Sequence, residues 1–184
     1  MGNIGGNMVY CKKYFSPLGE ITLNSDGEFL TALCFEDGKD YGRYIKSSEE
    51  RDLPIFEETV RWLDLYFSGK NPDFIPKYKR NDITPFRQEV IDEMLKIPYG
   101  TTVTYNDISK AIAQKRGLTK MSAQAVGGAV GWNPICIIIP CHRVVGTNGS
   151  LTGYGGGIIN KMKLLELEGV DITKYYVPKK GTAL

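Results

Sequence analysis

The chain has few of the residues that build metal sites or disulfide frameworks. It holds one histidine in 184 residues and four cysteines, and no two cysteines form a Cys-x-x-Cys pair. Structural zinc takes a cluster of Cys and His ligands at close spacing, so no metal is expected. Disulfide frameworks belong mainly to small secreted domains, and this chain is longer. We therefore expect free cysteines, no metal and a reducing, cytoplasmic location.

Long apolar runs are also missing. No stretch approaches the roughly 18–20 apolar residues needed to cross a bilayer. The start, Met1–Gly6, has neither the basic residues nor the apolar run of a signal peptide. The sequence therefore predicts no membrane partner, and its length allows one or two domains with a sizeable core.

The net charge is small, at +2, but it is distributed unevenly. Residues 1–82 carry 11 Lys and Arg against 14 Asp and Glu, whereas residues 83–184 carry 12 against 7. A basic half fits a polyanionic partner, although ordinary surface variation gives the same imbalance. No charged residue occurs from Met121 through Cys141. That stretch is either core or a surface that meets another body closely.

The first third of the chain is predicted to be an antiparallel β-meander. Short β-branched and aromatic runs at Val9–Phe15, Ile21–Asn24 and Phe29–Phe35 are separated by turn sequences. A helix is expected over Ile55–Phe67, and residues 69–83 have the composition of a linker. We therefore expect an N-terminal α/β domain over residues 1–82 and a second domain over residues 83–184.

The second half carries clear helix-start signals. Thr84, Thr104 and Ser122 each stand where a side-chain oxygen can cap a helix. The helices that they predict are Pro85 to about Pro98, Tyr105–Lys115 and Ala123–Val130. The last two, joined by a few residues that include Gly117, make a helix-turn-helix.

The third of these helices contains Gly127 and Gly128, each of which costs on the order of 1 kcal/mol relative to alanine. Small side chains allow a close approach of either a nucleic-acid groove or a neighbouring element, and the sequence leaves both open. Further on, Asn148-Gly149 predicts a hairpin that forms a small wing. A last helix is expected over about Asn160–Glu168, followed by a disordered or loosely packed tail from about Asp171.

The most informative segment is 133–145, in which Cys141 directly precedes the only histidine, His142. A thiol with a pKa near 8.5 attacks only as the thiolate, and an adjacent imidazole can take its proton. The β-branched run Ile135–Ile139 predicts a buried strand that leads to this pair. Because side chains alternate along a strand, Cys136 and Cys141 would point to opposite faces.

The motifs of the second half closely resemble those of the O6-alkylguanine-DNA alkyltransferases, also called methylated-DNA–protein-cysteine methyltransferases. The segments that carry the resemblance are Ala125-Val126-Gly127-Gly128-Ala129, Asn133-Pro134, Pro140-Cys141-His142-Arg143-Val144-Val145, Tyr154 and Leu164-Leu165-Glu166-Leu167-Glu168-Gly169. The resemblance is dense from about Thr84 to Gly169 and weaker in the first third. It implies an N-terminal ribonuclease H-like α/β domain followed by a helical domain with a winged helix-turn-helix.

The resemblance also implies an activity. Such a protein binds double-stranded DNA, flips out an O6-alkylguanine and moves the alkyl group once to its own cysteine, without a cofactor. By resemblance, Cys141 accepts the alkyl group, His142 takes the thiol proton through a water, and Glu168 holds the imidazole in the required tautomer. Asn133 would support the water and the turn, and Tyr105 would protonate O6 of the departing guanine. The residues expected to contact DNA or substrate are Ser122, Gln124, Ala125, Gly127, Arg143, Val144, Tyr154 and Gly155.

Two positions, Gln124 and Gly155, depart from the family pattern. Gln124 stands where the family often has an arginine that fills the gap left by the flipped base. Gly155 stands where a serine often contacts O6, so only its backbone N–H can serve. Arg143 is either a DNA contact or an anchor for the cysteine loop. Some relatives hold zinc through N-terminal Cys and His residues, but this N-terminal part has no histidine.

Two other classes of function are weighed against alkyl transfer. One is a non-catalytic module that recognises alkylated DNA, which an intact Cys141 motif argues against. The other is a thiol redox sensor, which needs a second cysteine on the same face as Cys141, and the predicted strand places Cys136 elsewhere. The leading hypothesis is repair of O6-alkylguanine by a monomer. Action on O4-alkylthymine and cooperative DNA binding are left open.

Overall fold

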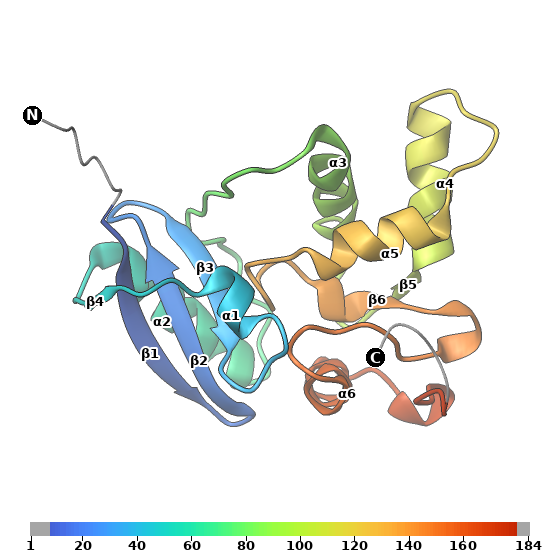
Figure 1. Cartoon of the computed structure of the whole chain (residues 1–184). Helices are drawn as coiled ribbons and strands as arrows, with labels where there is room; N and C mark the ends of the chain where they lie inside the picture. Colours follow the sequence, from blue (N-terminus) through green and yellow to red (C-terminus); the bar gives the residue numbers. More distant parts are fainter. Residues whose placement is uncertain (1–7, 180–184) are drawn as a thin grey trace, which may run out of the picture. The chain divides into compact units, whose positions relative to one another are not determined.

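A computed structural model describes residues 8–179 of the chain. The chain divides into two compact units, with the boundary between Asn81 and Asp82 (Figure 1). The segment Met1–Gly6, from which no signal peptide is expected, lies outside the described residues. Among residues 8–179, no helix combines the length and apolarity needed to cross a membrane.

The first unit contains a four-stranded sheet in the order β3-β2-β1-β4. β1 (Tyr10–Ser16), β2 (Gly19–Ser25) and β3 (Leu30–Phe35) form the predicted antiparallel meander. β4 (Glu49–Glu50) joins the edge in parallel with β1. Gly19, with φ of +122°, completes the tight turn between β1 and β2, a conformation that glycine adopts readily.

The helix predicted over Ile55–Phe67 is present as α2 (Pro54–Phe67). It contacts β1 and β2. A short helix, α1 (Tyr41–Tyr44), contacts β3. Part of the segment expected to be a linker is fixed on this sheet. The backbone N–H of Leu30 donates to the carbonyl of Lys77, and the N–H of Lys79 donates to the carbonyl of Leu30. The segment predicted to be a linker is therefore partly a structural element of the first unit.

The second unit begins with three helices that contact one another, α3 (Pro85–Met94), α4 (Tyr105–Lys115) and α5 (Ala123–Gly131). All three start at the predicted caps. Backbone N–H groups of the first turns donate to the side-chain oxygens of Thr84, Thr104 and Ser122. α4 and α5 form the expected helix-turn-helix.

A two-stranded parallel sheet connects this helical group to the remainder of the unit. β5 (Val103–Thr104) pairs with β6 (Val144–Val145), and Val103 lies opposite Val144. Because α4 follows β5 directly and β6 follows the Cys-His pair, the pairing brings the start of α4 close to Cys141. Helix α6 (Ile158–Leu167) follows and contacts the same region.

The strand predicted over Ile135–Ile139 is wrong. These residues form a buried turn in which Ile137 adopts φ of +68°, an uncommon conformation for a β-branched residue. The N–H of Ile139 donates to the carbonyl of Ile135 at 3.1 Å, which closes the turn. The chain then enters a short 3₁₀ helix, η1 (Cys141–Arg143). Side-chain alternation therefore does not apply between Cys136 and Cys141.

The predicted wing hairpin is also different. Asn148 and Gly149 do form a turn, with φ of 59° and 80°, within the 3₁₀ helix η2 (Thr147–Gly149). The backbone N–H of Gly146 donates to the carbonyl of Ser150 at 2.7 Å across this turn, but within residues 8–179 no pair of hairpin strands flanks it. β6 pairs with β5, and Ser150 makes a single parallel bridge to Tyr176.

The tail expected to be loose from Asp171 is packed over much of its length. It contains the 3₁₀ helix η3 (Ile172–Lys174). Ile172 and Tyr175 pack against a buried cluster of Val145, Leu151 and Leu165. The end of the tail, residues 180–184, lies outside the described residues.

Candidate active site

Cys141 and His142 lie at the start of η1, where the buried turn meets β6. The Cys141 side chain is 6% exposed and His142 is completely buried. Both therefore sit in a packed environment, where hydrogen bonds and charges act more strongly than in water.

Asn133 holds the turn and also reaches the cysteine. Its side-chain oxygen accepts the N–H of Ile135 at 3.0 Å, and its Nδ2 donates to the carbonyl of Ile139 at 2.9 Å. The same Nδ2 lies 3.0 Å from Sγ of Cys141. An N–H donor aimed at the sulfur stabilises the thiolate and lowers the thiol pKa. This amide is well placed for the role in the turn that the family resemblance implies.

A second thiol lies beside the first. Cys136 is within hydrogen-bonding reach of the Cys141 side chain, and its sulfur lies 3.9 Å from the carbonyl oxygen of Asn133. The neighbouring Cys136 sulfur, together with burial, raises the pKa of the Cys141 thiol well above its usual value. The expectation that the two cysteines face apart is wrong because the intervening residues turn.

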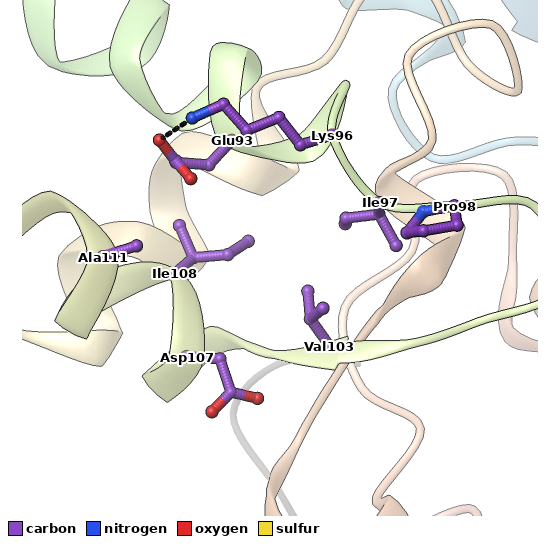
Figure 2. A pocket seen from close by; sticks show the side chains of 8 residues that line it. All are labelled: Glu93, Lys96, Ile97, Pro98, Val103, Asp107, Ile108 and Ala111. Atoms are coloured by element: carbon purple, nitrogen blue, oxygen red, sulfur yellow. Dashed lines mark hydrogen bonds and ion pairs between the residues drawn. The ribbon is translucent and has the colours of Figure 1, made fainter.

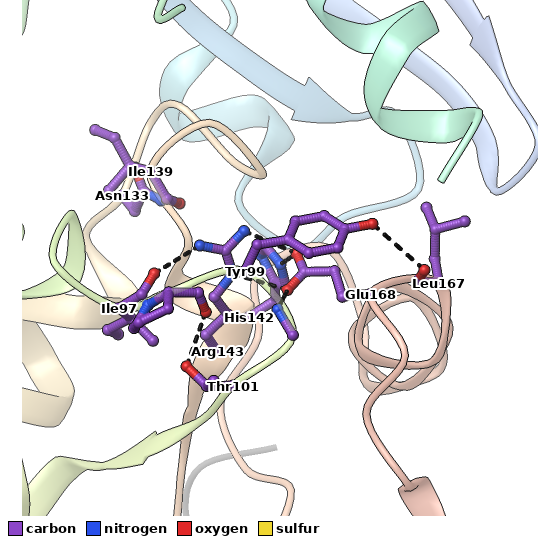
Figure 3. A network of polar contacts seen from close by, with 11 residues as sticks. Ile97, Tyr99, Thr101, Asn133, Ile139, His142, Arg143, Leu167 and Glu168 are labelled. Carbon is purple, nitrogen blue, oxygen red and sulfur yellow. Dashed lines mark hydrogen bonds and ion pairs between the residues drawn. The ribbon is translucent and has the colours of Figure 1, made fainter. Parts of the chain in front are cut away.

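Glu168 forms the centre of a buried polar network (Figure 3). Nε2 of His142 lies 2.6 Å from its Oε1, and Nε and Nη2 of Arg143 donate to the carboxylate at 2.8 and 3.0 Å. The backbone N–H of Gly100 donates to Oε2 at 3.1 Å. Although burial opposes ionisation, the bonds from His142 and Arg143 lower the pKa of Glu168 to about 2. Glu168 is therefore a carboxylate at neutral pH.

The carboxylate determines the state of the imidazole. Burial lowers the pKa of His142 below its usual value, despite the opposing effect of Glu168. In the neutral ring, Nε2 carries the hydrogen that it donates to Glu168, so Nδ1 carries the lone pair. His142 is thus poised to accept a proton at Nδ1.

Arg143 is engaged inside the protein. Besides its two bonds to Glu168, it donates from Nη1 to the carbonyl of Ile97 at 2.8 Å, and its side chain is 11% exposed. Its guanidinium also lies over the ring of Tyr99. Of the two alternatives for Arg143, these contacts favour the anchor of the cysteine loop over the DNA contact.

Sequence reasoning missed Lys161. Its side chain is completely buried, and Nζ donates to the carbonyls of Val144 and Thr152 at 2.6 and 2.9 Å. Burial lowers the pKa of Lys161 to about 8, and its charge acts to lower the pKa of Cys141. A lysine within a helix normally indicates a solvated face, so only the tertiary structure identifies this one.

Two tyrosines border the cysteine. The hydroxyl of Tyr105 donates to the carbonyl of Thr152 at 3.1 Å, and burial raises its pKa to about 12, so it stays protonated. Tyr154 is buried, with its ring edge-on to His142 at a centroid distance of 6.4 Å. Gly155, which follows it, is half-buried. Tyr154 therefore lies beside His142, and Tyr105 lies close enough to Cys141 for the two side chains to interact electrostatically.

Helix α5 presents Gln124, Ala125 and Gly128 to solvent. A side-chain carbon at Gly128 would meet nothing within 4 Å, whereas one at Gly127 would lie 3.8 Å from the ring of Tyr105. The two glycines thus serve different purposes. Gly127 faces a packed aromatic ring, and Gly128 keeps an exposed surface flat.

Several hollows lie near these helices. One, of about 580 Å³, lies beside the first turn of α5 and is lined by Asn106, Lys120, Met121, Ser122 and Ala123. Another, of about 190 Å³, is largely apolar and is bordered by α3, β5 and α4 (Figure 2). None of the expected site residues lines the second hollow. Within residues 8–179, no cluster of three or more His, Cys, Asp or Glu side chains could hold a metal ion.

Known proteins agree with this architecture. Residues 85–170 match the family described as 6-O-methylguanine DNA methyltransferase, DNA binding domain, and residues 9–75 match its ribonuclease-like domain. A methylated-DNA–protein-cysteine methyltransferase of Haemophilus influenzae is 36% identical over 162 residues, covering 88% of this chain and 87% of the relative.

Solved structures give the same result. The O6-methylguanine methyltransferase of Mycobacterium tuberculosis superposes with a TM-score of 0.73 at 39% identity, covering 94% of this chain and 97% of the other. The M. tuberculosis OGT protein in complex with DNA gives 0.70 at 37% identity, covering 90% and 94%. The expected fold class is thereby confirmed. The chain belongs to the methylated-DNA–protein-cysteine methyltransferase family.

Proposed function

We propose that this protein repairs DNA by direct reversal: it takes the alkyl group from an O6-alkylguanine onto Sγ of Cys141 and is used once. The observation that carries the proposal is the arrangement around one sulfur. Cys141 receives an N–H from Asn133 and directly precedes a neutral His142 that is held by Glu168. A buried thiol with its own amide donor and a neighbouring base fits nucleophilic attack.

The first step is loss of the thiol proton. Because the pKa of Cys141 is raised, the resting protein holds mostly thiol, and a base is required. Nδ1 of His142 takes the proton through a bridging water, and Glu168 stabilises the resulting imidazolium. Asn133 and the charge of Lys161 stabilise the thiolate that remains.

In the second step, Sγ of Cys141 attacks the alkyl carbon, so that the S–C bond forms while the bond from carbon to O6 breaks. The electron pair of that bond moves to O6 of guanine. Tyr105, whose pKa of about 12 keeps it protonated, donates to the departing oxygen. The product is a thioether, which is why each chain acts once.

The base must leave the stack before this reaction, because the alkyl carbon is unreachable inside the duplex. We assign the groove contact to the exposed face of α5, where Gln124 would hydrogen-bond the orphaned partner base. Ser122 and Lys120 lie at the start of that helix, beside the hollow described above. The similar M. tuberculosis OGT protein has been solved in complex with DNA, which supports DNA as the partner.

The decisive test is intact-protein mass spectrometry after mixing the full chain with a duplex carrying one O6-methylguanine. One added methyl, mapped to Cys141 and stopping at one per chain, is expected. Cys141→Ser should abolish the transfer while leaving DNA binding largely intact. Cys34→Ser, which removes a buried thiol of the first unit, is the matched control and should transfer normally.

Two outcomes would change the assignment. Tight binding to the lesion with no added mass would make the protein a recognition module, and His142 and Glu168 would lose their roles. DNA affinity that does not fall with added salt would contradict a phosphate-dominated interface, since such contacts release counterions.

We also propose that the protein is located in the cytoplasm. All four cysteines are free thiols, which fits the reducing environment of the cytoplasm. Cell fractionation followed by immunoblotting should find the protein in the cytoplasmic fraction, and recovery from an oxidising compartment would overturn this placement.

A further inference from the structure

The two thiols of the buried turn have a contact that alkyl transfer does not require. Cys136 and Cys141 are five positions apart, and the turn closed by the Ile139-to-Ile135 hydrogen bond brings their side chains within hydrogen-bonding reach. Asn133 connects both, because Nδ2 donates to Sγ of Cys141 and the backbone carbonyl accepts from Sγ of Cys136. Both cysteines lie in the second unit, while Cys11 and Cys34 lie in the first.

We propose that Cys136 is the resolving thiol for Cys141 and that the two form a reversible disulfide when the protein meets a hydroperoxide. His142 accepts the thiol proton of Cys141, and the resulting thiolate attacks the terminal peroxide oxygen. The O–O bond breaks, the departing oxygen takes the proton from His142 and leaves as an alcohol or water, and Cys141 is left as a sulfenic acid. The Cys136 sulfur then attacks the sulfenic sulfur, the S–S bond forms, and the hydroxyl leaves as water with the proton from Cys136. Overall, two thiols are oxidised by two electrons and one peroxide is reduced.

The disulfide has two consequences. It blocks the acceptor, because the sulfur that must attack the alkyl carbon is already bonded. It also protects the acceptor, because a sulfenic acid that becomes a disulfide is spared further oxidation to the irreversible sulfinic acid. A short loop gains little stability from its cross-link, so a thiol reductant should reopen it readily.

The sequence makes the test direct. Trypsin cuts after Lys120 and after Arg143, so both cysteines fall on the single peptide 121–143. The full chain carrying Cys11→Ser and Cys34→Ser has only this pair of thiols. After hydrogen peroxide, this peptide should lose two hydrogens and resist alkylation by iodoacetamide, and dithiothreitol should reverse both changes. Adding Cys136→Ser should abolish the loss and give a sulfinic acid at Cys141 that dithiothreitol does not reverse.

The effect on alkyl transfer rests on the proposed function, and the mass change does not. Oxidised chain with the Cys136–Cys141 pair should lose transfer completely and regain it with dithiothreitol, whereas the oxidised Cys136→Ser chain should not recover. Absence of the disulfide in a chain that transfers methyl when reduced would overturn the inference alone. A disulfide in a chain that never transfers would leave the inference standing and refute the proposed function. Should Cys136→Ser fail to fold by circular dichroism, Cys136→Ala provides the same comparison.

Discussion

Nε2 of His142 lies 2.6 Å from Oε1 of Glu168, and neither side chain has any exposed surface. The carboxylate fixes which imidazole nitrogen carries the hydrogen, and its charge favours the imidazolium that forms when a proton arrives. Because the same carboxylate also receives Arg143 and Gly100, the tautomer, the cysteine loop and the chain before β5 depend on one side chain.

Replacing Glu168 with glutamine should slow alkyl transfer by roughly 10²–10⁴-fold, the range that a positioned general base contributes. The amide keeps the shape but loses the charge that orients and stabilises His142. Single-turnover transfer from an O6-methylguanine duplex measures this effect. Glu166→Gln, an exposed position of α6, is the matched control and should transfer at the unaltered rate. Equal rates in the two variants would remove His142 and Glu168 from the proton transfer.

The same carboxylate should give stability that acid removes. The pKa of Glu168 is lowered from 4.5 to about 2 in the folded protein. Its contribution is therefore complete above pH 4.5 and is lost as pH falls toward 2, with a size on the order of 3 kcal/mol. Urea unfolding across this range should give a steeper acid loss for the original chain than for Glu168→Gln. Parallel curves would contradict the lowered pKa.

Lys161→Met should both destabilise the protein and disfavour the thiolate. The carbonyl of Val144 loses the Lys161 donor and that of Thr152 keeps the hydroxyl of Tyr105, and the lost bonds cost about 1–3 kcal/mol. Loss of the positive charge raises the pKa of Cys141, so the rise of the transfer rate should move to higher pH. The exposed Lys163→Met is the control. An unchanged pH profile in a destabilised Lys161→Met chain would make this lysine purely structural.

Gln124→Ala should affect duplex DNA more than a free base. Loss of one hydrogen bond of about 1 kcal/mol to the orphaned partner base corresponds to roughly fivefold slower transfer from the damaged duplex. Transfer from free O6-benzylguanine should be unchanged, because no partner base is present. Gln114→Ala, an exposed position on α4, tests for non-specific effects. Equal slowing on both substrates would argue against contact in the groove.

Gly100→Ala should cost more stability than Gly117→Ala. Both glycines have positive φ, 77° and 65°, so both substitutions strain the backbone. Only at Gly100 would the new carbon lie 2.8 Å from a backbone oxygen, that of Glu168, whereas Gly117 has nothing within 4 Å. Thermal unfolding should therefore give the lower midpoint for Gly100→Ala. A lower midpoint for Gly117→Ala would indicate that the backbone near Glu168 shifts to accommodate the new carbon at little cost.

The features predicted correctly are those that depend on residues close together in the sequence. Thr84, Thr104 and Ser122 cap their helices as expected, because a capping oxygen satisfies N–H groups only two or three positions away. The family motif located Cys141 and His142 for a different reason, since it identifies a whole constellation at once. The motif could not supply the contacts that surround those two residues.

The failures come from long-range packing. The run Ile135–Ile139 has the composition of a strand, but the side chain of Asn133 satisfies its backbone and stabilises a turn. Lys161 has no local sign of burial, because its two acceptors come from other parts of the chain. The hairpin predicted at Asn148 is wrong for a similar reason, because Ser150 forms its bridge with Tyr176, far along the sequence.

Four donors converge on the carboxylate of Glu168, two from Arg143 and one each from His142 and Gly100. A carboxylate has about four lone-pair directions, so these donors fill them all. With its pKa lowered to about 2, Glu168 does not take up a proton that reaches His142, so the network ends at this carboxylate. A catalyst that turns over must return its proton to solvent in every cycle. A protein consumed by its own reaction has no such requirement, so it can leave the proton on His142.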